Sequence, residues 1–215
     1  MMFWHFFLLC NLILLIGCEH QEKSEKSLDD LNTIKKDFLL SIMRQEINES
    51  PFQMNYSFKT VFFSKDIISL LGEMNVYNHL PHGWSRCEGK TFCKTDGKFE
   101  EIKLSDLFTT ASQKEFLRKY CENDLKSQSI SYFSEISSLR TTLEYADMTT
   151  FVINDKYLIV LFQPYVVKGL EDGPSHVKIP LEHLKNQWTS SNPLALLLPL
   201  TISSRSYVAS WDQID

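Results

Sequence analysis

Residues 149–162 read TTFVINDKYLIVLF, and this stretch decides the fold class. Two runs rich in β-branched and aromatic residues, Thr149–Ile153 and Tyr157–Phe162, flank Asn154 and Asp155, which are typical of tight turns. The pattern predicts a β-hairpin. In the second run both alternating sets of side chains are apolar, which is typical of a central strand that is buried on both faces. We therefore expect this hairpin to form the middle of the core.

Further strands are predicted before this hairpin. Tyr56–Phe63 has the composition of a strand, and Lys65–Leu71 and Glu73–Tyr77 are predicted as two more strands with a bulge at Gly72 between them. A second hairpin is expected across residues 95–97, because the Asp-Gly pair there favours a two-residue turn.

Helices are predicted on either side of these strands. Leu28–Ile47 carries apolar residues at i+3 and i+4 spacing, and Ala111–Leu143 is mostly helical in pattern, with a break expected in its serine-rich part. Pro180 is expected at the first position of a last short helix that extends through Leu184 and Trp188. Strands beside segregated helices predict an α+β fold with a mostly antiparallel sheet, two longer helices and a short C-terminal helix.

Composition and charge restrict the functional class. The chain has 215 residues, of which 43% are hydrophobic and 13% aromatic, so it is long enough to bury a core and is unlike a disordered protein. The 22 basic and 27 acidic residues give a net charge of -5. This balance argues against a non-specific nucleic-acid binder, which usually carries a basic stripe.

The N-terminus reads as an export signal. Residues 1–17 are almost wholly apolar, but a run of this length is short for a membrane-spanning helix, which needs roughly 20 residues. The run ends in Leu15-Ile16-Gly17-Cys18, which resembles the bacterial lipobox. Cys18 is then the lipidated residue, and its diacylglycerol and N-linked acyl chain, such as palmitate, anchor the protein to the membrane. The alternatives are an uncleaved N-terminal anchor and a buried apolar helix.

These features predict an envelope lipoprotein that faces the outside of the cytoplasm. Its expected organisation is a signal peptide (1–17), a lipidated tether (18–27), an N-terminal helix (28–55), an α+β domain (56–188) and a C-terminal tail packed on that domain (189–215).

The cysteines and two histidines form the sharpest local cluster. Cys87 and Cys93 are candidates for a disulfide, which suits an exported protein, whereas Cys121 is expected as a buried thiol on a helix. His79 and His82 lie nearby, and His and Cys are the ligands that zinc prefers. The spacing fits no common zinc module, so we favour the disulfide over a metal site or free thiols, and we expect no cofactor.

Four stretches in fixed order carry a resemblance to a known family. They are Tyr77-x4-His82-Gly83, residues 104–108 (LSDLF), the hairpin segment 151–165, and Ile179-Pro180-x3-Leu184. Together they resemble the extracytoplasmic C-terminal domain of RsiV-type anti-sigma factors, which also occurs beside some peptidoglycan deacetylase modules and in bacterial lipoproteins. The resemblance covers roughly residues 56–188. It implies an envelope location, and in RsiV-type proteins this domain binds lysozyme. The family pattern has two glycines before its histidine, and this chain has neither.

We expect a non-catalytic binding module for a cell-wall component, such as peptidoglycan, or for an envelope protein, such as a lysozyme-like enzyme. The candidate binding residues are His79, His82 and Trp84, in the loop that the resemblance includes. One alternative is a hydrolase of envelope glycans that uses His82 and a nearby carboxylate; Asp106 is better explained as a helix cap. The other is a structural subunit that joins an envelope assembly through its tail, Leu194–Ile202.

Overall fold

The computed structural model describes residues 28–41, 53–77, 84–128, 142–164, 166–167, 173–189, 191–197 and 207–208. The chain divides into two units, residues 1–50 and 51–215. In the first unit, residues 28–41 form a helix in which Leu31 and Phe38 are buried. This confirms the predicted helix over that range, and its expected continuation to Ile47 lies outside the described residues.

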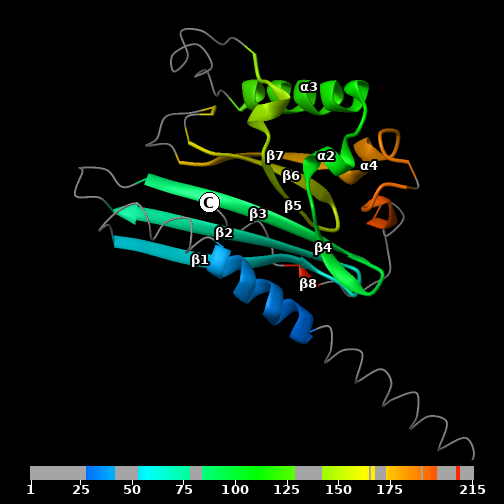
Figure 1. The fold of residues 1–215 in the computed structure, drawn as a ribbon. Helices are drawn as coiled ribbons and strands as arrows, with labels where there is room; N and C mark the ends of the chain where they lie inside the picture. Colours follow the sequence, from blue (N-terminus) through cyan, green and yellow to red (C-terminus); the bar gives the residue numbers. More distant parts are fainter. Residues whose placement is uncertain are drawn as a thin grey trace, which may run out of the picture. The chain divides into compact units, whose positions relative to one another are not determined.

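The second unit contains two antiparallel sheets and several helices (Figure 1). Sheet A has the order β4-β3-β2-β1-β8, and its strands are β1 (Gln53–Phe63), β2 (Ile67–Tyr77), β3 (Trp84–Thr95), β4 (Lys98–Ile102) and β8 (Tyr207–Val208). Sheet B has the order β5-β6-β7, and its strands are β5 (Thr150–Ile153), β6 (Tyr157–Phe162) and β7 (Ser175–Pro180). The helices are α2 (Leu104–Leu107), α3 (Ala111–Ser127), α4 (Leu181–Leu184) and the 3₁₀ turns η2 (Tyr145–Asp147) and η3 (Ala195–Leu197). The predicted α+β class is confirmed.

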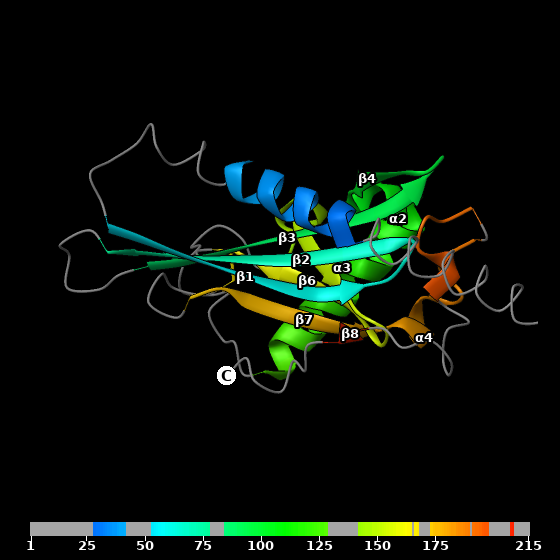
Figure 2. The same ribbon diagram turned by 90° about the horizontal axis from the view of Figure 1, so that it is seen from below.

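Sheets A and B pack face to face, and α3 packs on β7 in sheet B (Figure 1). Figure 2 shows the same layers from a second side, with β1, β2 and β3 running alongside one another. The central strand of sheet B is β6, and residues 158–162 in it are all buried, as the apolar run predicts. Leu194 and Leu197 belong to the same core, so this part of the tail is buried in the protein's own interior.

Both predicted hairpins are present. The β3–β4 turn places Asp96 at φ 50° and Gly97 at φ 82°, the left-handed conformations that a two-residue turn needs and that Gly adopts without strain. In the β5–β6 turn, the side chain of Asn154 replaces a backbone partner, because its Oδ1 accepts hydrogen bonds from the backbone N–H groups of Lys156 and Tyr157.

The predicted break at Gly72 is wrong, because β2 is one continuous strand in which Gly72 pairs with Phe58. The bulge lies in β1 instead, where the register shifts between Thr60 and Phe62. The extra residue lets Val61 and Phe62 both turn toward the interior, and both are buried. The alternation of residue types along β2 gives no sign of this bulge, because the bulge lies in the partner strand β1.

The helix boundaries differ from the expectation in three places. The α2 helix is capped at Lys103, and Asp106 sits at its third position, where its Oδ2 accepts a hydrogen bond from the Lys103 N–H at 2.8 Å. Pro180 is the residue before α4 and not the first residue in it. The helix predicted over 111–143 is described only as α3, and residues 129–141 lie outside the described part. Cys121 is a fully buried thiol on α3, as expected.

Candidate binding pocket between the two sheets

Hydroxyl side chains join the two sheets. Thr150 Oγ1 on β5 accepts a hydrogen bond from the Gly89 N–H at 2.8 Å and donates one to the Gly89 carbonyl oxygen, also at 2.8 Å. Ser69 Oγ on β2 accepts a hydrogen bond from the Ile153 N–H at 2.9 Å and lies 2.9 Å from Thr91 Oγ1 on β3. All three hydroxyl-bearing residues are buried, so these bonds hold sheet B over sheet A at a fixed position.

The close approach of β5 to β3 requires a glycine at position 89. A Cβ atom there would lie 2.4 Å from the carbonyl oxygen of Phe151 and 2.8 Å from Cγ1 of Val152. Any larger residue would push the two strands apart, so Gly89 sets the spacing of the sheets at this point.

A pocket of about 270 Å³ opens at one end of this interface, and we call it the inter-sheet pocket. Leu71, Cys87 and Leu161 are buried apolar residues that line it from both sheets. Polar groups line the rest of it: Glu73, Asn75, Ser85, Arg86, Ser175 and His176. Apolar lining with a few converging polar groups is the usual make-up of a small-molecule site.

Two side chains fix the shape of this pocket. Gln163, which follows β6, accepts a hydrogen bond from the Cys87 N–H at 3.3 Å through its Oε1 and donates one from its Nε2 to the Cys87 carbonyl oxygen. Glu73 accepts a hydrogen bond from the Ser57 hydroxyl at 3.2 Å. The amide of Gln163 therefore ties β3 to sheet B next to the pocket, and the carboxylate of Glu73 is held on β2.

Ser175 lies at the edge of this pocket; it is only 5% exposed, and its Oγ has no hydrogen-bond partner among the described residues. His176 is the next residue in β7, and consecutive side chains of a strand point to opposite faces. His176 pairs with Leu161 and shares its face toward sheet A, whereas Ser175 pairs with Phe162 on the other face. The Ser175 hydroxyl therefore points away from the inter-sheet pocket, and it is not paired with the neighbouring imidazole as a nucleophile would be with its base.

The predicted disulfide between Cys87 and Cys93 is wrong. Both residues are free thiols on the single strand β3. Six residues of extended chain separate their Cα atoms by about 20 Å, whereas a disulfide needs them within roughly 7 Å. Burial, with a smaller effect of Glu73, raises the pKa of the Cys87 thiol to about 12, and burial also raises that of Cys93. Cys87 is thus an uncharged apolar part of the pocket lining.

The remaining predicted site residues fall largely outside the described part. His79 and His82 belong to residues 78–83, between β2 and β3, and Cys18 precedes residue 28. Trp84 is the first residue of β3 and pairs with Val76, which places its backbone one residue pair from Asn75 and Ser85 in the pocket.

The described residues contain no group of three or more His, Cys, Asp or Glu side chains that is arranged to hold a metal ion. None of the helices in the described ranges has the length and apolarity needed to cross a membrane.

Sequence reasoning missed Ser175, Glu73, Asn75 and Ser85. No local pattern distinguishes them, because they meet only when β2, β3 and β7 come together. The one available signal is the Gly173-Pro174 turn before Ser175, where Gly173 adopts φ +69° and a Cβ atom would lie 3.0 Å from Ser85 Oγ.

Part of the chain is similar to a known family. Residues 105–182 match the model of the DUF3298 family, described as a protein of unknown function. No curated protein matches the chain.

Two solved structures of that family match the chain, and the first of them is similar in fold. A DUF3298 family member from Bacteroides fragilis has 16% sequence identity and a TM-score of 0.52, over 76% of this chain and 66% of the other. A DUF3298 family protein from Pseudomonas aeruginosa has 12% identity and a TM-score of 0.49, over 68% of this chain and 67% of the other. The chain thus spans slightly less than two thirds of the length of the Bacteroides protein. The family resemblance of this chain thus lies in residues 105–182, which are similar to the DUF3298 family.

Proposed function

We propose that this chain is an exported, lipid-anchored envelope protein that binds a cell-wall component in the inter-sheet pocket without transforming it. The proposed location rests on the apolar residues 1–17 and the lipobox-like Leu15-Ile16-Gly17-Cys18. An anchor at Cys18 followed by a short polar tether would hold the folded unit close to the wall polymer.

The observation that carries the binding proposal is the convergence of apolar and polar side chains in the inter-sheet pocket, where the buried Leu71 and Leu161 meet the partly exposed Ser85. A ligand that hydrogen-bonds to the Ser85 hydroxyl would at the same time contact this apolar lining. Cell-wall glycans and their peptide stems are rich in hydroxyl and amide groups, which suit the serine, asparagine and carboxylate side chains around the pocket. The apolar lining from Leu71 and Leu161 suits a methyl group or a sugar ring face.

The chemistry of the pocket favours binding over hydrolysis. The Cys87 thiol, with its pKa raised to about 12, is neutral at physiological pH and so is a poor nucleophile. Ser175 and His176 project to opposite faces of β7, so the imidazole is not placed to take the proton of this hydroxyl.

Co-sedimentation with purified peptidoglycan sacculi tests the proposal. We expect the purified full chain in mild detergent to pellet with sacculi in a saturable way. Ser85→Ala should weaken this binding about five- to tenfold, the effect of one lost hydrogen bond, while leaving the fold intact. Ser112→Ala is the matched control, because Ser112 is exposed at the start of α3, outside the pocket.

Pelleting no greater than that of an unrelated protein would refute the wall ligand. Equal binding by the Ser85→Ala and Ser112→Ala variants would refute the role of the pocket. Release of soluble fragments from the sacculi would refute the non-catalytic part of the proposal.

A further inference from the structure

The charged residues that line the inter-sheet pocket from sheet A point in opposite directions. Glu73 on β2 pairs with Cys87 on β3, and Leu71 lies two residues before it on the same strand. Because alternate residues of a strand share a face, the Glu73 side chain points toward sheet B together with this lining. Arg86 is adjacent to Cys87, so its side chain points to the other face of sheet A. The carboxylate therefore faces the pocket without the guanidinium.

The carboxylate of Glu73 has capacity for a further partner. It accepts a hydrogen bond from the Ser57 hydroxyl at 3.2 Å, and among the described residues it belongs to no ion pair. Burial is the larger cause that raises the pKa of the Cys87 thiol to about 12, and Glu73 adds to it, as a carboxylate beside the thiol should. Glu73 is only partly buried, so a ligand in the pocket can reach its oxygens. A carboxylate can accept several hydrogen bonds, and those from an ammonium group are stronger than those from a neutral donor.

An apolar surface lies beside this carboxylate. Leu71, Cys87 and Leu161 belong to one buried cluster and form the apolar part of the lining. An alkyl chain that ends in an ammonium group presents the same two features, since its methylene groups are apolar and its tip is positively charged. The volume of about 270 Å³ is slightly below that of most ligand pockets, which suits a group of side-chain size.

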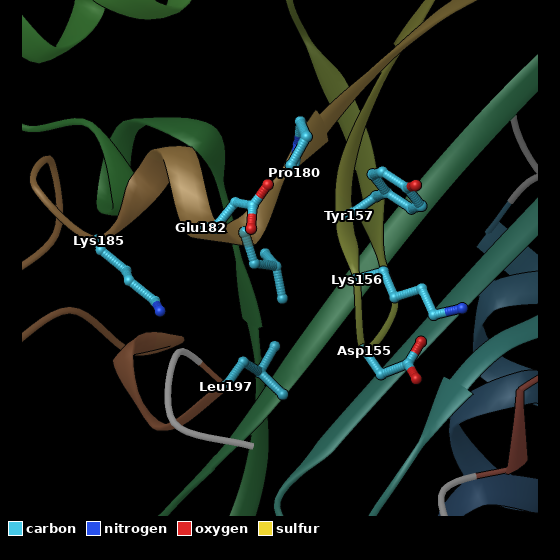
Figure 3. Close-up of a pocket in the computed structure, with 8 residues that line it drawn as sticks. Asp155, Lys156, Tyr157, Pro180, Glu182, Lys185 and Leu197 are labelled. Atoms are coloured by element: carbon cyan, nitrogen blue, oxygen red, sulfur yellow. The ribbon is translucent and has the colours of Figure 1, made fainter. Parts of the chain in front are cut away.

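A second pocket of the same volume, about 270 Å³, lacks this arrangement (Figure 3). It lies between the β5–β6 turn and α4, and its charged lining residues are Asp155, Lys156, Glu182 and Lys185. Two ammonium groups accompany its two carboxylates, so its lining has no net charge that would favour a cation. Glu182, which Figure 3 shows on the α4 side, is therefore a suitable control position for Glu73.

We propose that the inter-sheet pocket binds the ammonium-ended side chain of a diamino acid, a group that wall peptides carry. The ammonium group donates hydrogen bonds to the Glu73 carboxylate, and the methylene chain contacts Leu71 and Leu161. The Ser85 hydroxyl then binds a hydroxyl or amide group of the same ligand. This inference rests on the proposed function and adds the chemical group through which the wall component is held.

A ligand-observed NMR titration of the full chain in mild detergent tests the chemistry of the pocket with three small probes. Nα-acetyl-lysine amide carries a side-chain ammonium, its Nα,Nε-diacetyl derivative carries a neutral amide there, and Nα-acetyl-norleucine amide ends in a methyl group. We expect saturable binding of the first probe, at least tenfold tighter than that of the other two. Equal affinity for the three probes, or no saturable binding of the first, would overturn the proposal. These comparisons use the unmodified chain, so they decide the matter even if a variant fails to fold.

The variant Glu73→Gln tests whether this carboxylate binds the ammonium group. Glutamine has nearly the same size, and its amide oxygen can still accept the hydrogen bond from Ser57. We expect the variant to bind the first probe about tenfold more weakly and no better than the diacetyl derivative. Glu182→Gln, the matched control in the second pocket, should bind as the unmodified chain does. A preference for the first probe that persists in Glu73→Gln would overturn the proposal.

Acetylated sacculi separate this inference from the proposed function. Acetylation converts the free amines of the wall peptides into neutral amides and leaves the glycan chains uncleaved. We expect the chain to bind acetylated sacculi about tenfold more weakly than untreated ones in co-sedimentation. Equal pelleting with both preparations would overturn the inference and leave the proposed function standing. No pelleting with either would refute the proposed wall ligand, and the titration then decides alone whether the pocket binds an ammonium group.

Discussion

Replacement of Gly89 by alanine is predicted to separate the two sheets. The new Cβ would lie 2.4 Å from the Phe151 carbonyl oxygen, whereas ordinary contacts of a Cβ atom begin near 3.4 Å. The clashing atoms include the backbone of β5, so no side-chain rotation relieves the overlap. Strand β5 must therefore move away from β3 by about 1 Å, the difference between the two distances.

The magnitude follows from what this movement breaks. A 1 Å displacement stretches both 2.8 Å hydrogen bonds between Thr150 and Gly89 to about 3.8 Å, beyond the range of a hydrogen bond. Each is worth about 1 kcal/mol, and overpacking itself costs about 1–3 kcal/mol. The expected loss is about 3–5 kcal/mol of unfolding free energy, which is a large part of the stability of an ordinary domain. For a chain of this size it lowers Tm by about 6–20 °C.

Equilibrium unfolding in urea, followed by circular dichroism, measures this loss. Gly97→Ala is the control, because Gly97 has φ +82° with no atom within 4 Å of the added Cβ, so only backbone strain of about 1–2 kcal/mol is expected. A loss for Gly89→Ala no larger than that for Gly97→Ala would refute the reasoning. A second check is additivity: Thr150→Val should add little to Gly89→Ala, because the same two hydrogen bonds are already broken.

Three further predictions concern single groups. Thr150→Val should cost about 1–3 kcal/mol in urea unfolding because it leaves the Gly89 N–H and carbonyl unsatisfied, and Thr150→Ser should cost clearly less; equal losses would contradict this. Burial first, and then Glu73, raises the pKa of Cys87 to about 12, so the folded state keeps a proton that the unfolded chain loses above about pH 8.5. Stability should therefore fall as pH rises from about 8.5 toward 12, less steeply in Cys87→Ala, and an equal slope in the variant would count against this assignment. Hydrogen bonds from Lys126 and Arg118 hold the pKa of Glu122 below its usual range, so Glu122→Gln should lower Tm at pH 7, by an amount that shrinks as the pH falls below about 4.

The hairpins could be predicted from sequence because their determinants are local. Asp96-Gly97 supplies the left-handed turn, and Asn154 supplies the side chain that caps the β5–β6 turn. The apolar run of β6 likewise predicts burial on both faces, since each residue in it has to pack against something whichever way it points. In these segments the distribution of apolar residues and the residues at the turns predict the same structure, and that structure is the one observed.

Other features depend on partners that are distant in the sequence. The position of the bulge in β1 reflects the need to bury both Val61 and Phe62, a requirement set by the facing sheet. The spacing of Cys87 and Cys93 suits a closed loop only if the chain turns between them. Instead, this segment pairs with β2 and β4 as one extended strand, and the two thiols end far apart. Cysteine spacing alone does not distinguish a loop from a strand.

The inter-sheet pocket shows why sites of this kind are hard to find from sequence. Ser85 is one of many serines in the chain, and it becomes distinctive only because β2, β3 and β7 come together around it. The apolar lining of the pocket is equally divided between distant segments, because Leu71 lies on β2 and Leu161 on β6. Such a pocket is a property of three-dimensional packing, so no local pattern in the sequence identifies it.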